Sequence, residues 1–566
     1  MRINKRSLSS NKFITVLVLI AILGGVLRLT SLEDSPPSLN WDEISHGYNA
    51  YSILKTGRDE WGAFLPITNF RAYGDYPLPL NLYITIPFIW LLGLDAFSIR
   101  LPHAILGTLT IIVTYFLVYG ITKKKTLSLF SALLVAIEPW NVFPSRFVLQ
   151  SNLSVFFLTA AAAAFFNREK NKYLLPLSFL FFGLTLFSYH STRIFTPLFL
   201  VPLLTIYRNE LAKVIKKEKK ISYLSLAVII LFFAPLPFIL AKPEARARSQ
   251  AVFLIDEGAI SAIVQNRQTS NLPNVVKRII YNKPVYFIEH FFQNYIEYFS
   301  PKFLFLDGGT QYQFSVPRQG LLLLINLPFF YIGVFILFKK AIARDKKYQL
   351  ILAWLLISPI PASITTEHYA VLRASTMLPV PAILSAMGVW VVYDWLPKFK
   401  PMILAVYFLI LFILLGRYLN NYFNDYKKNY SWAWQYGYKQ AVLYAKENYE
   451  EYDKIIITKK YGEPHEFFLF YWPWDPAKYQ NDPNLIRFFQ SNWYWVDRFD
   501  KFYFVNDWEI PKTEGGRWRM ENGGEIPVDG KMLLVTSPGN FPLGWTWLKT
   551  VEFVDGKPAF DLLEKI

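Results

Sequence analysis

The sequence contains no cysteine among its 566 residues. This absence excludes disulfide bonds, thiolate zinc sites and a cysteine nucleophile. Histidine is scarce, with six residues, and no two of them have the HExxH spacing of a zinc-binding helix. The sequence also shows no solenoid-type repeat. Carboxylates, basic residues and isolated histidines are therefore left as candidates for chemistry.

Long apolar stretches dominate what is present. Hydrophobic residues make up 53% of the chain and aromatic residues 18%, more than a soluble surface tolerates. A membrane span needs about 20 apolar residues. About eleven stretches approach this length, near residues 13–31, 98–121, 126–142, 151–166, 173–189, 194–207, 221–240, 319–338, 348–363, 372–393 and 401–419.

The net charge of +17 fits either nucleic-acid binding or basic cytoplasmic loops. Its distribution decides between these, because every second connection between the apolar stretches is basic, at 123–125, 168–172, 213–220, 339–347 and 398–400. This alternation predicts a multi-pass protein of the cell (inner or plasma) membrane, with a cytoplasmic amino terminus and no nucleic-acid partner. The first stretch resembles a signal peptide but lacks a small-residue cleavage motif, so we expect an uncleaved helix.

The topology predicts two domains. Residues 1–419 form a transmembrane domain with long outer loops at 32–97 and 241–318, and residues 420–566 form a small extracytoplasmic α/β domain. In the second domain an amphipathic helix pattern at 431–449 precedes β-like runs that begin near residues 453, 466, 502 and 531.

The first outer loop carries carboxylates next to a predicted membrane boundary. Asp42, Glu43 and His46 open it, and Asp75 follows in the segment Gly74-Asp75-Tyr76-Pro77. A carboxylate there can serve as a base or as a ligand of a divalent metal, and Asp42, Glu43 and His46 are the candidate ligands. The alternative is a hydrated carboxylate that caps a helix beginning at Ile44.

Cations gather at the predicted outer ends of later helices. They can grip a phosphate, or they can extend towards lipid headgroups. An aromatic segment in the second outer loop, Tyr298 to Phe305, contains another cation and fits either a sugar or phosphate site or an interfacial aromatic belt. The candidates are Arg146, His190, Arg193, Lys302, His368 and Arg373.

Taken in order, these segments resemble the GT-C superfamily of glycosyltransferases, in particular the bacterial group related to protein O-mannosyltransferases and to the lipid A aminoarabinose transferase. The resemblance rests on Asp42-Glu43, Gly74 to Pro77, Arg100-Leu101-Pro102, Pro144 to Arg146, YFSPKFLF, SVPRQG, Pro359 to Thr365, and His368, Arg373 and Leu378-Pro379.

The resemblance implies inverting transfer of a sugar from a polyprenyl-phosphate carrier to a protein, lipid or glycan acceptor at the outer face of the membrane. Asp42 would be the catalytic base. Glu43 and Asp75 would position the acceptor, a metal or the loop. Cations would stabilise the departing phosphate, with Arg146, Arg193, Arg373 and Lys302 as candidates and His190 and His368 beside them.

One departure from the family pattern concerns the cation before the prolines. Relatives often have a lysine there, whereas this chain has Tyr76 before Pro77. Either a different cation meets the phosphate, with Arg71 as the candidate, or donor binding differs in this chain. Two alternative functions remain open, a transporter or flippase of lipid-linked sugars and a glycan polymerase or ligase. Transporters commonly show inverted repeats and midplane charges, which are not evident here.

Overall fold

The computed structural model describes residues 5–513 and 516–566. It contains two compact units. The helical unit comprises Met1–Thr30, His103–Ser145 and Leu149–Asn420, and the sheet unit comprises Ser31–Pro102, Arg146–Val148 and Asn421–Ile566. The sheet unit thus combines the first outer loop with the carboxy-terminal segment.

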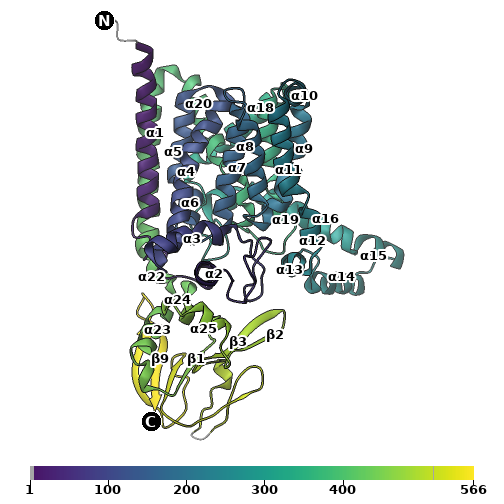
Figure 1. The fold of residues 1–566 in the computed structure, drawn as a ribbon. Helices are drawn as coiled ribbons and strands as arrows, with labels where there is room; N and C mark the ends of the chain where they lie inside the picture. Colours follow the sequence, from purple (N-terminus) through teal and green to yellow (C-terminus); the bar gives the residue numbers. More distant parts are fainter. Residues whose placement is uncertain (1–4, 514–515) are drawn as a thin grey trace. The chain divides into compact units, whose positions relative to one another are not determined.

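The helical unit is built from roughly aligned helices with shorter helices at one end (Figure 1). Its main helices are α1 (Lys5–Leu29), α4 (Ala96–Thr122, whose first turns lie in the sheet unit), α5 (Lys125–Ile137), α6 (Pro139–Val142), α7 (Gln150–Asn167), α8 (Leu174–Thr185), α9 (His190–Ile206), α10 (Arg208–Lys217), α11 (Lys219–Phe233), α12 (Leu236–Ala241), α17 (Leu327–Ile342), α18 (Lys346–Ile357), α19 (Ile360–Ser363), α20 (Val380–Trp395) and α21 (Lys400–Asn420).

Apolar length confirms the predicted polytopic membrane protein. Among the described residues, five helices are long and apolar enough to cross a membrane, or six if one bent pair counts as a span, and three further apolar helices are shorter. The assignment of individual stretches, among the eleven predicted, as membrane-crossing helices stays a prediction. The stretch 126–142 is not one straight helix, because α5 ends before Pro139 and the chain bends by 71° there. A proline inside a helix removes a hydrogen bond and breaks the helix.

The segment predicted as the second outer loop is largely helical. It contains α13 (Pro243–Val252), α14 (Glu257–Thr269), α15 (Asn274–Ile280) and α16 (Lys283–Glu297). Two of these helices begin with side-chain caps, since Asp256 accepts from the amide of Ala259 and Asn282 accepts from the amide of Val285. Such caps satisfy amides that have no partner inside the helix.

A seven-stranded sheet forms the centre of the sheet unit, in the order β2-β3-β4-β1-β7-β9-β8. Strand β1 pairs in parallel with β4 and β7, and the other pairs are antiparallel. The strands are β1 (Lys454–Thr458), β2 (Ile486–Gln490), β3 (Trp493–Phe499), β4 (Phe502–Val505), β7 (Met532–Thr536), β8 (Thr546–Glu552) and β9 (Pro558–Lys565), with a small β5 (Trp518–Arg519) and β6 (Glu525–Ile526) hairpin beside them.

Both faces of this sheet are covered. Alternate residues of β1 point to opposite faces, so Ile455 and Ile457 join one core and Ile456 joins the other. The first core also contains residues of α2 (Trp41–Thr56) and α3 (Leu80–Leu92) from the first outer loop, and of α23 (Tyr438–Glu447) and α24 (Pro464–Tyr471). The loop helices and the sheet therefore share one hydrophobic core.

Three of the four predicted β-like runs are confirmed as β1, β4 and β7. The prediction near residue 466 was wrong, because that run is α24, which has proline at its first position. The predicted helix over 431–449 is shorter, since a 3₁₀ turn precedes α23. Figure 1 shows α23, α24 and α25 (Pro476–Gln480) on the same side of the sheet.

Candidate active site

The first turn of α2 presents the Asp42 carboxylate. The helix begins at Trp41, not at Ile44. Its cap is Asn40, not one of the carboxylates that the alternative interpretation made the cap. The Asn40 side chain accepts from the Glu43 amide at 2.9 Å, and the Glu43 carboxylate accepts from the Asn40 amide at 3.3 Å. This capping box fixes the turn, and the helix dipole favours a negative charge at Asp42.

Tyr73 holds the Asp42 side chain. Its hydroxyl donates to Asp42 Oδ1. The tyrosine ring stacks on Trp493 of β3 with centroids 5.1 Å apart, and its carbonyl accepts from the Tyr494 amide at 2.7 Å. Burial raises the pKa of Tyr73, so the phenol stays protonated as a donor. The sheet thus orients the carboxylate through this tyrosine.

Glu43 is fully buried and paired with Arg100 of α4. The guanidinium donates to both carboxylate oxygens, at 2.8 Å each. Arg100 also donates to carbonyls of the preceding loop, and the Val148 amide donates to Glu43 Oε1 at 3.0 Å. Of the roles predicted for Glu43, the geometry favours positioning of the catalytic loop.

Arg146 is also fully buried in the sheet unit. It donates to the Tyr422 hydroxyl at 3.1 Å and to the Ser35 carbonyl at 3.0 Å, and it lies over the ring of Phe423 at 4.9 Å. A guanidinium with no exposed surface is poorly placed to meet a lipid phosphate. In this structure Arg146 packs against the preceding loop and two aromatic rings, and its contact with a phosphate stays a prediction.

Arg71 and Asp75 lie in the turn before α3. Arg71 lies over the rings of Trp61 at 5.2 Å and Tyr494 at 4.5 Å, and it is half-buried. Asp75 accepts from the Tyr76 amide at 2.8 Å and so shapes the turn. Arg71 is exposed enough to contact an anion, so its role as the cation that meets the donor phosphate stays a prediction.

The predicted metal ligands Asp42, Glu43 and His46 do not converge. Glu43 faces Arg100, and His46 Nδ1 lies 2.7 Å from the Asp42 carbonyl instead of its carboxylate. Burial lowers the pKa of His46, so the ring is neutral. In the part of the chain that the structure describes, the converging potential ligands are Glu60, His465 and Glu466.

In the helical unit, a cavity of about 230 Å³ gathers several predicted cations. His190 and Arg193 reach it from the first turn of α9, and Arg373 reaches it from the 3₁₀ turn before α20. Arg246 of α13 also lines the cavity, and the sequence analysis missed it because it lies in a charged run without a motif. The remaining walls are mostly apolar, including Leu240, Val252, Phe253, Pro361 and Ile364.

The other two candidate cations of this unit lie outside the cavity lining. Lys302 has a side chain 62% exposed and sits 3.9 Å from Asp307. His368 is 3.1 Å from Glu297 and its side chain is 49% exposed. Arg373 is more buried, pairs with Glu367 and donates to the Thr365 hydroxyl at 3.4 Å. The structure thus separates Lys302 and His368 from the group around Arg373.

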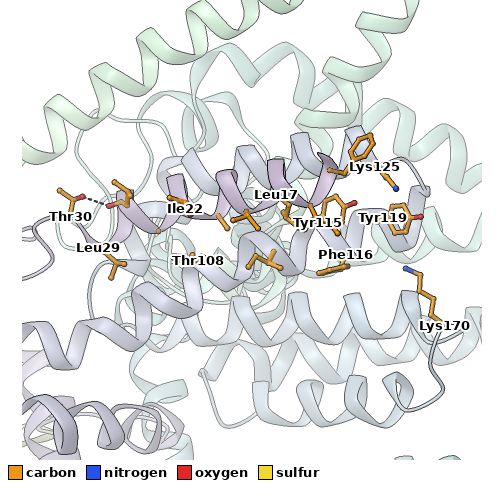
Figure 2. A pocket seen from close by; sticks show the side chains of 17 residues that line it. Leu17, Ile22, Leu29, Thr30, Thr108, Tyr115, Phe116, Tyr119, Lys125 and Lys170 are labelled. Atoms are coloured by element: carbon orange, nitrogen blue, oxygen red, sulfur yellow. Dashed lines mark hydrogen bonds between the residues drawn. The ribbon is translucent and has the colours of Figure 1, made fainter. Parts of the chain in front are cut away.

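An apolar groove of about 1100 Å³ runs along α1 and α4 (Figure 2). Lys125 and Lys170 lie near one end of it, and Leu29 and Thr30 lie near the other. Its lining and size suit a hydrocarbon chain.

Residues 67–243 match a family model described as dolichyl-phosphate-mannose-protein mannosyltransferase. Among solved structures, the chain is similar to apo ArnT from Cupriavidus metallidurans, with 11% identity, 99% of this chain and 98% of that chain covered, and a TM-score of 0.51. The same protein bound to undecaprenyl phosphate gives a TM-score of 0.50, at 11% identity and 98% coverage of both chains.

The apo oligosaccharyltransferase of Archaeoglobus fulgidus also matches, at 16% identity over 81% of this chain, with a TM-score of 0.48. The chain spans 63% of that protein's length. No curated protein sequence matches the chain significantly.

These findings confirm the predicted class, since the chain has the fold of the GT-C membrane glycosyltransferases. The fold is similar to that of ArnT, and the sequence matches the mannosyltransferase family model over residues 67–243. The transporter alternative is not favoured.

Proposed function

We propose that this chain is an inverting glycosyltransferase that moves a sugar from a polyprenyl-phosphate carrier to an acceptor hydroxyl at the outer face of the membrane. The observation that carries the proposal is the Asp42 carboxylate, presented by a capped helix and oriented by Tyr73. A base held in one orientation avoids reorganisation during the reaction.

In the proposed reaction Asp42 accepts the proton of the acceptor hydroxyl while its oxygen attacks the anomeric carbon. The new glycosidic bond forms as the bond to the carrier phosphate breaks, and the phosphate oxygen leaves with the electron pair. Attack from the face opposite the leaving group inverts the anomeric centre. Polyprenyl phosphate leaves as an anion, so the site needs cations there rather than a second acid.

We propose that the cavity around Arg193 and Arg373 supplies these cations, with Arg246 and His190 as further donors. Arginine suits this task because its planar guanidinium donates two parallel hydrogen bonds to a phosphate. The amides at the start of α9 add positive potential at the same wall.

The proposed carrier, acceptor and location are supported by separate observations. The ArnT structure with undecaprenyl phosphate supports a polyprenyl carrier for this fold, and the name of the matching family supports a protein hydroxyl among the candidate acceptors, which also include lipids and glycans. We place the enzyme in the cell membrane with a cytoplasmic amino terminus and an extracytoplasmic carboxy-terminal domain, because the basic connections alternate along the chain.

The test is transfer from radiolabelled polyprenyl-phosphate sugars by the purified full-length chain, with membrane protein, lipid and glycan fractions as separate acceptors. We expect Asp42→Asn to lower the rate by about 10²- to 10⁴-fold, as loss of a general base does. Asp34→Asn is the matched control, since Asp34 is an exposed carboxylate in the same loop. Full activity of Asp42→Asn would refute the base assignment, and no transfer from any donor would refute the enzyme.

The cavity is tested by Arg373→Gln, with Arg278→Gln on the exposed side of α15 as control. We expect the cavity variant to raise KM for the donor and to lower kcat, because the phosphate is held in the ground state and carries more charge in the transition state. An effect on acceptor KM alone would remove the cavity from donor binding.

A further inference from the structure

We propose that Glu60, His465 and Glu466 bind one divalent transition metal, Zn²⁺ or Mn²⁺, which fastens the first outer loop to the carboxy-terminal domain. Each residue offers a ligand atom within 4.8 Å of those of the other two. The three residues are 2%, 3% and 1% exposed, respectively. The site is separate from Asp42 and from the cations proposed to meet the donor.

The buried carboxylates have too few partners in the protein itself. Trp61 donates to Glu60 Oε1 at 2.9 Å, but Glu60 Oε2 and Glu466 Oε2 are buried without a hydrogen-bond partner among the described residues. Two carboxylates so close together repel each other when both are ionised. A divalent cation would supply the missing partner and balance both charges.

The nearby guanidinium does not fill this gap. Arg487 donates to the backbone carbonyl of Glu60 at 2.8 Å, and it stacks on Trp61 at 4.2 Å and Tyr479 at 4.8 Å. Within residues 5–513 and 516–566, neither Glu60 nor Glu466 takes part in an ion pair. Arg487 therefore fixes the backbone around the cluster, and its charge acts on Glu60 without a direct ion-pair contact.

The chemistry of the ligand set selects the metal. His465 offers an imidazole nitrogen, which binds metals in its neutral form. Glu463 lies 3.6 Å from His465 Nδ1, in the position of a carboxylate that orients a ligating imidazole. One imidazole with two carboxylates suits Zn²⁺ or Mn²⁺. Because the cluster is closed to solvent, we assign the ion a structural role.

The cluster lies where the loop after α2 meets α24, so a bound ion would connect these two segments. The Glu60 amide donates to Asn49 Oδ1 on α2 at 3.0 Å, which connects the loop after this helix to the helix itself. His465 and Glu466 lie in the first turn of α24, which packs against α2. The ion would therefore join both sides of the interface that positions the helix bearing Asp42.

The experiment measures metal content of the purified full-length protein by mass spectrometry, after loading with Zn²⁺ or Mn²⁺ and removal of excess. We expect about one ion per chain in the wild type and almost none in His465→Asn or Glu466→Gln. Glu447→Gln is the matched control, because Glu447 is an exposed carboxylate on α23 of the same domain. His46→Asn should also keep its ion, which separates this site from the start of α2.

A second measurement uses only the wild type, so it does not depend on whether the variants fold. Chelation should lower the unfolding temperature of the wild type by on the order of 5 °C, and addition of Zn²⁺ or Mn²⁺ should restore it. No bound ion after loading, with an unfolding temperature insensitive to chelation, would refute the proposal and assign the cluster to a proton shared by Glu60 and Glu466. Metal retained by His465→Asn and Glu466→Gln but lost by His46→Asn would also refute it.

Discussion

Glu43 and Arg100 form an ion pair in which neither side chain is exposed, and we predict that Glu43→Gln strongly destabilises the sheet unit. The variant keeps the shape of the side chain but leaves the Arg100 charge without its carboxylate. Breaking a buried pair in this way costs about 3 to 5 kcal/mol. Because Glu43 also accepts amides from Asn40 and Val148, the glutamine must leave part of this network unsatisfied.

For a unit of this size, 1 kcal/mol corresponds to a shift of roughly 2 to 4 °C in Tm, so we expect a decrease on the order of 10 °C. The assay is thermal unfolding of the detergent-solubilised protein, followed by intrinsic tryptophan fluorescence. Transfer activity measured below the new Tm should also fall, because the turn that carries Asp42 loses its anchor.

Two comparisons make this test specific. Glu33→Gln is the control for the same chemical change on an exposed side chain of the same loop, and it should leave Tm unchanged. The double variant Glu43→Leu with Arg100→Met removes both charges, so it should be more stable than Glu43→Gln while its transfer stays low. A change in Tm of less than about 2 °C for Glu43→Gln would refute the claim that this pair organises the loop.

Two further predictions concern the same helix. Tyr73→Phe removes the hydroxyl that orients Asp42. It should lower kcat by roughly tenfold and the free energy of unfolding by about 1 kcal/mol. An unchanged kcat would show that Asp42 does not need this hydrogen bond. Gly47→Ala places a Cβ 2.6 Å from the Phe470 ring of α24 and should cost about 1 to 3 kcal/mol of unfolding free energy, whereas Gly416→Ala has open space and serves as control.

The membrane character and three of the seven strands of the sheet could be predicted because they depend on local patterns. Apolar runs of sufficient length mark the helices, and short apolar runs mark β1, β4 and β7. The apolar run at α24 was misassigned since a short segment that is buried all round has no periodicity, and periodicity is what separates a helix from a strand. Pro464 before the run was the available signal for a helix start.

The candidate site was predictable only in part. Asp42 could be proposed from its place after an apolar stretch, but its neighbours depend on contacts between distant segments. Arg100 lies 57 positions from Glu43, and Glu60 comes together with His465 only through the tertiary fold. The burial of Arg146 was not predictable either, because an arginine predicted at a helix end looks the same in sequence whether it is exposed or packed inside a loop.

Two arginines of the sheet unit are buried in contacts with the protein, whereas two of the helical unit line a cavity. This difference supports the roles that the proposed reaction gives to the two units. In the sheet unit, Arg100 and Arg146 are buried and bound to a carboxylate, carbonyls and rings, and Arg100 holds Glu43, the residue after the partly exposed Asp42. In the helical unit, Arg193 and Arg373 border a cavity large enough for a small anionic group. A base must be held still to accept a proton, whereas phosphate-binding cations must face a space that a ligand can enter. If this reasoning holds, the Glu43 and Arg100 variants will change kcat and stability together, while the Arg373 variant will change donor KM without a large change in Tm.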